Sequence, residues 1–559
     1  GTWHMAHGTW HMAHGTWHMA QIALLLFALF SSDADSSTPA DGHHVETMTV
    51  PRFGLLTRLW AQEAIGAPEA HALLAKLAAN KFEFYFPRIA IFTERVGLSE
   101  AFKNVRISEE LGQELAEEAQ GSIVDMNQHA DDLHGDEFAE AFEDYHRISS
   151  GDGRTHIAAV ANLLASDSPV GISKYGVIAA IANLEYEDVD EGVRIYLSQN
   201  TEAYVDIIHF SVFLQKPYEY QAIADLSEQY GKFLLIASAG NSFPDEVFGD
   251  NAISDISVIS VGSCNPAGSP SHFSQCGRLN ILAPSDDYIQ THTEDSTTLA
   301  TFSGTSGASP LVSGAVADFL AILPSKQIAY PQLTKLLQAT AIPVAVDPKI
   351  DGDVRVLNYY KLLRVALRIR HAIADDLDSA KIRTMIADPA TYDFSAEAVE
   401  AKQLALKSVG KEHFQLLRQA FFLNPEDREI RNLLSSFYRS HGFKAQAIYY
   451  SNPVQALEEL LTIDAHKYRQ HLKSLYDAKI FADGKLTSEY KNFMLAAVKL
   501  NSSDILAHTL DRISSHPDDQ LKSKLDLLAV IGINPAELAV DKPKLFKMFK
   551  RHQAKLLAR

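Results

Sequence analysis

Between residues 119 and 370, short runs rich in Val and Ile alternate with longer segments that carry helical periodicity. The strand-like runs read SIVDM, VGISKYGVIAAI, VDIIHFSVF, FLLIASAGN, ISVISVGS and NILAPS. Strands that alternate with helices predict right-handed βαβ units and a parallel sheet with helices on both faces. Ligand-binding residues in such domains lie at the carboxyl ends of the strands. We therefore predict an α/β domain over this range, with its site directly after the strands.

The segments on either side of this domain have different patterns. Residues 45–118 carry helical periodicity and are expected to form an N-terminal extension or a propeptide. Residues 371–559 contain only helix-like segments, which predict an all-α C-terminal domain and a candidate surface for a protein partner. Within it, residues 413–450 resemble a tetratricopeptide-type helix pair. Only one such unit is clear, so a plain helical bundle explains the segment equally well.

Residues 1–44 are not expected to fold. A GTWHMAH period opens the chain, and residues 21–30, QIALLLFALF, have the length of a signal-peptide core rather than of a membrane span. We therefore expect an exported protein, periplasmic or extracellular, without a stable membrane span. Cys264 and Cys276 are the only cysteines. They would form a disulfide in an oxidising compartment and would be two small buried thiols in a reducing one.

The charge balance restricts the partners. Lys and Arg number 50 against 70 Asp and Glu, which gives a net charge of −20. An acidic surface argues against general nucleic-acid binding, because phosphate contacts need a basic face. Residues 542–559 are basic and amphipathic instead, and they would dock on their own domain or contact a membrane or partner.

The stretch Ser303–Pro310, SGTSGASP, is followed by a small-residue apolar helix and carries the strongest chemical signal. It sets Ser306 at the mouth of a helix, where free backbone N–H groups and the positive end of the helix dipole favour negative charge on an attacked carbonyl. Gly304 and the other small residues leave room for a substrate backbone. This box resembles the serine box of the subtilisin-like proteases (subtilases).

The resemblance implies an active-site set in the family's order. Ser306 would be the nucleophile of a serine endopeptidase that acts on polypeptides through an acyl-enzyme. The run ending in Gly240 and Asn241 resembles the strand that presents the family's oxyanion asparagine, and Ser122–Asp125 resembles the strand that presents the triad aspartate. Asp125 would hold the base imidazole in one tautomer.

The base of this set is displaced in the sequence. Aligning Thr155 and His156 on the family's HGTHVAG puts Gly153 where the catalytic histidine is expected. His156 lies three residues later, one helical turn or about 4.5 Å along the axis but on the same face. We expect His156 to act as the base if the helix starts later than in the family. His146, in a polar loop upstream, is a weaker candidate.

The substrate cleft departs from the family as well. Ser211, Val212 and Phe213 occupy the extended strand end that would bind substrate, and Phe213 stands where the family has glycine. That bulk would narrow the cleft. The alternative is therefore a catalytically dead subtilase fold that acts as a protein-binding module.

No cofactor or metal is expected from a motif. Many subtilases bind calcium, but the loop carboxylates here show no ligand spacing. They are Asp250, Asp286 and Asp287. Ser285 also departs from the family, which has glycine after the preceding proline.

Overall fold

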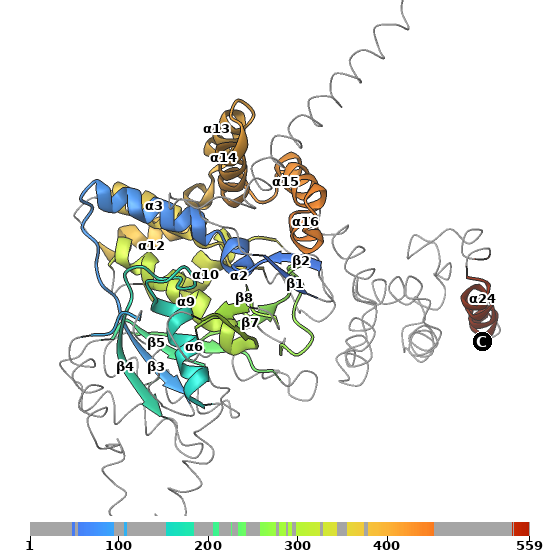
Figure 1. Cartoon of the computed structure of the whole chain (residues 1–559), viewed down its shortest axis with the longest axis horizontal. Helices are drawn as coiled ribbons and strands as arrows, with labels where there is room; N and C mark the ends of the chain where they lie inside the picture. Colours follow the sequence, from blue (N-terminus) through green and yellow to red (C-terminus); the bar gives the residue numbers. More distant parts are fainter. Residues whose placement is uncertain are drawn as a thin grey trace, which may run out of the picture.

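Six strands form one parallel sheet in the order β4-β3-β5-β6-β7-β8 (Figure 1). Their bounds are Arg88–Thr93 for β3, Val177–Asn183 for β4, Ile207–Phe210 for β5, Leu234–Ser238 for β6, Val258–Cys264 for β7 and Ile281–Pro284 for β8. Every neighbouring pair runs parallel. All described side chains of β5, β6, β7 and β8 are buried, as expected for strands covered on both faces. The predicted parallel α/β sheet is confirmed.

This computed structural model describes part of the chain. The described residues are 47–50, 54–93, 105–108, 153–183, 205–211, 225, 233–241, 258–275, 279–286, 289–292, 298–324, 328–343, 355–373, 378–451, 539 and 542–557. The repeat and signal-like segment, residues 1–44, lies outside them, as does the expected strand at Ser122–Asp125.

The sheet begins earlier in the chain than the sequence predicts. Strand β3 lies between β4 and β5, with Ile91 opposite both Ile181 and His209. Ile91 and Phe92 are completely buried. Because an interior strand cannot be removed without exposing the strands beside it, residues 88–93 belong to the sheet and not to a separable extension or propeptide. The expected boundary between residues 118 and 119 is corrected accordingly.

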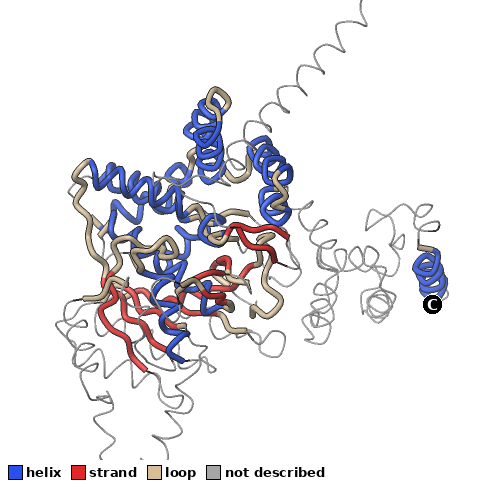
Figure 2. The backbone as a smooth tube through the Cα atoms, viewed as in Figure 1, coloured by secondary structure: helices blue, strands red, loops and turns tan. Residues whose placement is uncertain are grey.

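Helix α9, Thr305–Ile322, packs directly on the sheet and is flanked by α6, Gly153–Ala165 (Figure 2). The two helices approach closely at Gly314. A Cβ atom there would stand 2.9 Å from both the Leu164 carbonyl oxygen and Ile172 Cβ. Glycine is therefore required at position 314 for α6 and α9 to pack at this distance.

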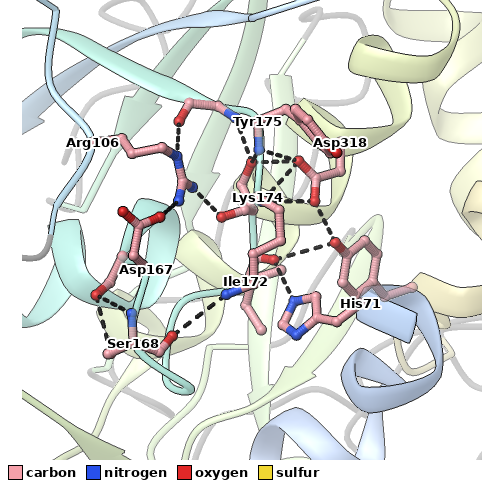
Figure 3. A network of polar contacts seen from close by, with 12 residues as sticks. His71, Arg106, Asp167, Ser168, Ile172, Lys174, Tyr175 and Asp318 are labelled. Atoms are coloured by element: carbon pink, nitrogen blue, oxygen red, sulfur yellow. Dashed lines mark hydrogen bonds and ion pairs between the residues drawn. The ribbon is translucent and has the colours of Figure 1, made fainter. Parts of the chain in front are cut away.

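One carboxylate deep in α9 fixes the loop that joins α6 to β4 (Figure 3). Asp318 is fully buried and accepts hydrogen bonds from Ser173 Oγ at 2.6 Å, from the backbone N–H groups of Lys174 and Tyr175 at 2.8 and 2.9 Å, and from Tyr359 OH at 2.5 Å. Burial raises the pKa of Asp318, while these hydrogen bonds oppose that shift. The carboxylate thus joins α9, the 166–176 loop and α11, Tyr359–Ile373.

Short elements complete the body. The antiparallel ribbons are β1, Thr47–Val50, with β2, Gly54–Thr57, and β9, Ile289–Thr291, with β10, Ala300–Phe302. Within the described ranges, the other helices before α11 are α2, Trp60–Ala64, α3, Ala67–Ala79, and α10, Tyr330–Thr340. Ribbon β9–β10 leads the chain directly into the start of α9.

From α11 onward, the described elements are all helical, as predicted. They are α12, Ser379–Ala387, the 3-10 helix η3, Pro389–Tyr392, α13, Ser395–Ala405, α14, Gly410–Leu423, α15, Arg428–Ser440, α16, Lys444–Tyr450, and α24, Pro543–Leu557. The expected boundary at residue 371 falls inside α11, so it does not separate two domains. Helix α14 ends at Leu423, beside the Asn424–Pro425 break expected from the sequence. The tetratricopeptide-type pairing stays a prediction.

A buried ion pair joins this helical part to the N-terminal helices. Arg418 on α14 donates to Glu69 on α3 at 2.6 Å and to the hydroxyls of Tyr438 and Tyr450 at 3.1 and 3.0 Å. Both charged side chains are almost fully buried. This contact therefore joins α3 to α14, across 349 positions in the sequence.

Two further sequence expectations meet the structure here. Cys264 is a free, fully buried thiol rather than half of a disulfide, and Cys276 lies outside the described residues. Burial raises the pKa of the Cys264 thiol well above its usual range, so it packs as a small apolar group. None of the helices in the described residues is long and apolar enough to cross a membrane.

Candidate active site

Ser306 lies at the second position of α9, immediately after a glycine turn. The chain enters the helix through Gly304 with φ 93°, a left-handed conformation that favours glycine. All residues of α9 are buried except Ser306, which is half-buried. The hydroxyl is thus presented at the N-terminal end of a buried helix, where the backbone N–H groups and the helix dipole favour an anion.

Asn241 is tied to the residue before Ser306. It follows the end of β6, and its Oδ1 accepts hydrogen bonds from Thr305 N at 2.8 Å and from Thr305 Oγ1 at 3.1 Å. Thr305 Oγ1 in turn accepts from the N–H of Gly240 at 3.1 Å. Because Oδ1 is occupied as an acceptor, Nδ2 is left as the donating end of an exposed amide. The structure thus places Asn241 beside Thr305, the residue before Ser306, and its role as the oxyanion donor stays a prediction.

Ser211 and Ser306 contact each other through two hydrogen bonds. Ser306 Oγ donates to the Ser211 carbonyl oxygen at 2.9 Å, and Ser211 Oγ donates to the Ser306 carbonyl oxygen at 3.3 Å. A serine hydroxyl has one proton. In this arrangement the proton of Ser306 therefore points to a carbonyl oxygen and not to an imidazole.

His156 lies on the helix that flanks α9. Helix α6 begins at Gly153, so the later start that would bring His156 into the first position is not observed. The half-buried His156 ring stands edge-on to Phe302, with ring centroids 5.6 Å apart. Phe302 is the last residue of β10, four positions before Ser306. His156 thus lies on the side of α6 that faces the serine turn.

His209 is a site residue that sequence reasoning missed. It lies on β5, completely buried, with Nδ1 2.8 Å from Ser313 Oγ and Nε2 3.1 Å from Ser211 Oγ. Burial, with a smaller contribution from the charge of His156, lowers the pKa of His209 to about 3. The imidazole is therefore neutral at physiological pH. The signal in the sequence was a histidine within an apolar strand, two residues before Ser211.

Several predicted site residues fall outside the described part of the chain. They are Asp125, His146, Val212 and Phe213. The carboxylate role of Asp125 and the narrowing of the cleft by Phe213 therefore stay predictions. Strand β3 ends at Thr93 beside β5, so in the described sheet the position next to β5 is occupied by residues 88–93.

Ser285 lies beneath the serine turn. A Cβ atom at Gly307 would come within 2.1 Å of Ser285 Oγ, so Gly307 leaves room for the hydroxyl that replaces the family's glycine. Ser285 is completely buried, and its hydroxyl has no hydrogen-bond partner within the described ranges. The departure at Ser285 is thus accommodated by the glycine opposite it.

The described residues contain no cluster of three or more His, Cys, Asp and Glu side chains that could hold a metal ion. Of the loop carboxylates considered for calcium, Asp286 is buried, whereas Asp250 and Asp287 lie outside the described part. The calcium question is not tested by this structure.

Comparison with known proteins agrees with this geometry. Residues 123–364 match the model of the subtilase family. This segment is similar to the subtilases. The matched range starts after β3, although β3 is an interior strand of the parallel sheet.

The chain is similar to an intracellular serine protease of Paenibacillus polymyxa, 29% identical over 254 residues that span 41% of this chain and 71% of that protein. Among solved structures, the prenylagaramide maturation protease PagA is 20% identical with a TM-score of 0.34, covering 52% of this chain and 98% of that one. The patellamide maturation protease PatG is 20% identical with a TM-score of 0.36, covering 54% and 97%. A cold-adapted subtilisin-like serine proteinase is 25% identical with a TM-score of 0.29, covering 36% and 73%.

Proposed function

We propose that this chain is a serine endopeptidase that hydrolyses polypeptides through an acyl-enzyme on Ser306. The observation that carries the proposal is the position of Ser306, half-buried at the N-terminus of a buried helix, directly after Thr305, which donates two hydrogen bonds to the Asn241 amide oxygen. The family match over residues 123–364 supports the same reaction class.

In the proposed reaction Ser306 Oγ attacks the scissile carbonyl carbon and its proton passes to a base. The carbonyl oxygen becomes an oxyanion, which would accept hydrogen bonds from Asn241 Nδ2 and from backbone N–H groups of the α9 turn. Collapse of this intermediate expels the amine, which takes the proton from the base. Water then releases the acid from Ser306 by the same steps in reverse order.

We assign the base to His156 and its orienting carboxylate to Asp125. The contact between His156 and Phe302 supports a place near the serine turn. The assignment requires one local change, because the Ser306 hydroxyl must turn away from the Ser211 carbonyl oxygen to donate to an imidazole. A serine side chain needs only a rotation about χ1 for this.

A second candidate is a subtilase-fold protein without catalysis that binds proteins through its helical C-terminal part. Two observations favour it. Gly153 occupies the first turn of α6 where the family has its base, and the Ser306 proton is directed at a carbonyl oxygen. A subtilase without its base loses about a million-fold in rate.

A fluorophosphonate probe separates the two candidates, because it reacts covalently only with an activated serine. The peptidase predicts labelling of the wild-type chain, loss of labelling in Ser306→Ala, and strong reduction in His156→Ala but not in His146→Ala. The same variants are assayed on a denatured protein substrate. If the folded wild-type chain is neither labelled nor proteolytic, the peptidase is excluded and the binding protein is the function that agrees with the result.

A further inference from the structure

A directed chain of hydrogen bonds runs beneath the serine turn. It starts at Ser313 on α9, passes through the His209 imidazole on β5 and the Ser211 hydroxyl, and ends at the Ser306 carbonyl oxygen. The distances along it are 2.8, 3.1 and 3.3 Å. It therefore links the third turn and the first turn of α9 through the end of the neighbouring strand.

The chemistry of the groups fixes the direction of this chain. The Ser306 carbonyl oxygen can only accept a hydrogen bond, so the Ser211 hydroxyl donates its single proton to it. Ser211 Oγ must then accept from His209, which requires the proton on Nε2. A neutral imidazole with Nε2–H has a lone pair on Nδ1, and this lone pair accepts from Ser313 Oγ–H.

The same chain holds the partner of the nucleophile. The Ser211 carbonyl oxygen receives the Ser306 hydroxyl, so a shift of Ser211 moves both the backbone and the side chain of Ser306 relative to β5. His209 contacts neither Ser306 atom directly in these bonds. Its influence on Ser306 is therefore exerted through Ser211.

We propose that His209 is a positioning residue, which holds Ser211 through Nε2–H and thereby fixes Ser306 for reaction. The inference rests on the proposed function of Ser306 as a nucleophile. His209 is not assigned the role of base, since it is completely buried and separated from Ser306 by Ser211.

The first test reads the tautomer without any activity. Nitrogen-15 spectra of the full chain labelled at histidine, with His209→Asn used to assign the signal, report which ring nitrogen carries the proton. We expect Nε2–H with an unprotonated Nδ1 between pH 6 and 8. A proton on Nδ1 would reverse the chain and overturn the proposal.

The second test uses fluorophosphonate kinetics with graded variants. Gln at position 209 keeps a donor near the Nε2 position, whereas Asn keeps only a group near Nδ1. We expect His209→Asn and Ser211→Ala each to lower the maximal labelling rate at least about tenfold, with a smaller change in probe affinity. His209→Gln should retain more of the rate than His209→Asn. Combining His209→Asn with Ser211→Ala should add little, because both break the same link.

Ser309→Ala is the matched control. Ser309 lies on α9 one turn before Ser313, equally buried, and its hydroxyl has no hydrogen-bond partner in the part of α9 and its surroundings that the structure describes. This variant should label at the wild-type rate. Thermal melting of each variant shows whether a lower labelling rate comes from unfolding or from displacement of Ser306 in a folded chain.

The outcomes distinguish this inference from the proposed function. If folded His209→Asn is labelled at the wild-type rate, His209 does not position Ser306, and Ser306 is still the nucleophile. A wild-type chain that never reacts would remove the nucleophile itself, and with it the catalytic part of the inference. The tautomer measurement would still decide whether the hydrogen-bond chain exists.

Discussion

Asn241 combines an observed contact with a proposed one. Its Oδ1 binds Thr305, which fixes the loop after β6 to the start of α9. Its Nδ2 is then the end that would face the oxyanion. A substitution at this position therefore has to be chosen so that the two contacts are tested separately.

Asn241→Asp keeps an acceptor for Thr305 and removes the donor. We expect it to lower kcat by about a hundredfold to a thousandfold with little change in KM, the effect of losing one oxyanion donor in a subtilase. Asn241→Ala should lower kcat similarly and also lower the melting temperature. Steady-state hydrolysis of a chromogenic peptide gives both constants, and an unchanged kcat in Asn241→Asp would exclude Asn241 as the donor.

His209 makes stability depend on pH in a defined direction. Its pKa is about 3 in the folded chain, against about 6.5 when unfolded. Between these two pKa values, His209 binds a proton in the unfolded state but not in the native state. The stabilising contribution is complete above about pH 6.5 and is lost as the pH falls toward 3, by about 1.4 kcal/mol per pH unit.

Urea unfolding between pH 7 and pH 4.5 measures this effect. The free energy of unfolding should fall less steeply with acid in His209→Asn than in the wild type, with the difference confined to the range below about pH 6.5. Parallel curves for the two proteins would show that His209 titrates normally in the folded chain.

At the scale of single elements, α9 combines a reactive end with an anchored middle. The first turn carries Ser306, and three turns later Asp318 binds four donors from the 166–176 loop and α11. A buried carboxylate with these partners is costly to truncate, because each donor left without an acceptor loses its compensation for burial. The anchor fixes the position of the whole helix, and so of its first turn.

Asp318→Ala should therefore destabilise the chain by at least about 3 kcal/mol. It removes the acceptor of the Lys174 N–H and leaves the Tyr175 N–H and the Tyr359 hydroxyl only their longer contacts, to Ser173 Oγ at 3.3 Å and to the Ile172 carbonyl oxygen at 3.2 Å. Asp318→Asn keeps one acceptor oxygen at nearly the same shape and should cost less. Denaturant unfolding compares them, with Glu400→Ala on an exposed face of α13 as a surface control expected within about 0.5 kcal/mol. Equal losses in Asn and Ala would contradict this account.

The elements differ in how far the sequence predicts them. The serine turn, β6 with Asn241, and helices α6 and α9 could be predicted because their signals are local: glycine turns, apolar runs and helical periodicity. His209 could not be given a role, because its partners lie on α9 and after β5 and only the packing of helix on sheet brings them together. The later start of α6 that was expected for His156 is not observed.

At the scale of the whole molecule, the described elements from β2 to β3 and helices α11, α14 and α16 belong to the same body as the parallel sheet. Strand β3 is interior to the sheet, and Arg418 on α14 is buried against Glu69 on α3. Strand β3 is therefore part of the fold that carries the site, and processing that removed it would leave β4 without its partner and β5 paired with β6 alone.

A chain that starts at residue 119 tests this directly. We expect it to lack a cooperative thermal transition, because it loses β3 and the α3 contact of Arg418. A chain that starts at residue 45 keeps both and should melt like the full-length protein. Circular dichroism measures both, and cooperative melting of the shorter chain would restore the boundary expected from the sequence.

The sequence by itself determined the fold class and the pair of Ser306 and Asn241, because each depends on a short pattern whose meaning does not change with distant residues. The tertiary structure decided the strand that fills the sheet between β4 and β5, the place of His209 beneath the serine turn, and the union of α3 with α14. These features depend on contacts between segments far apart in the chain, and in the last case 349 residues separate the partners. Only the folded packing selects among the many pairings that such distances allow.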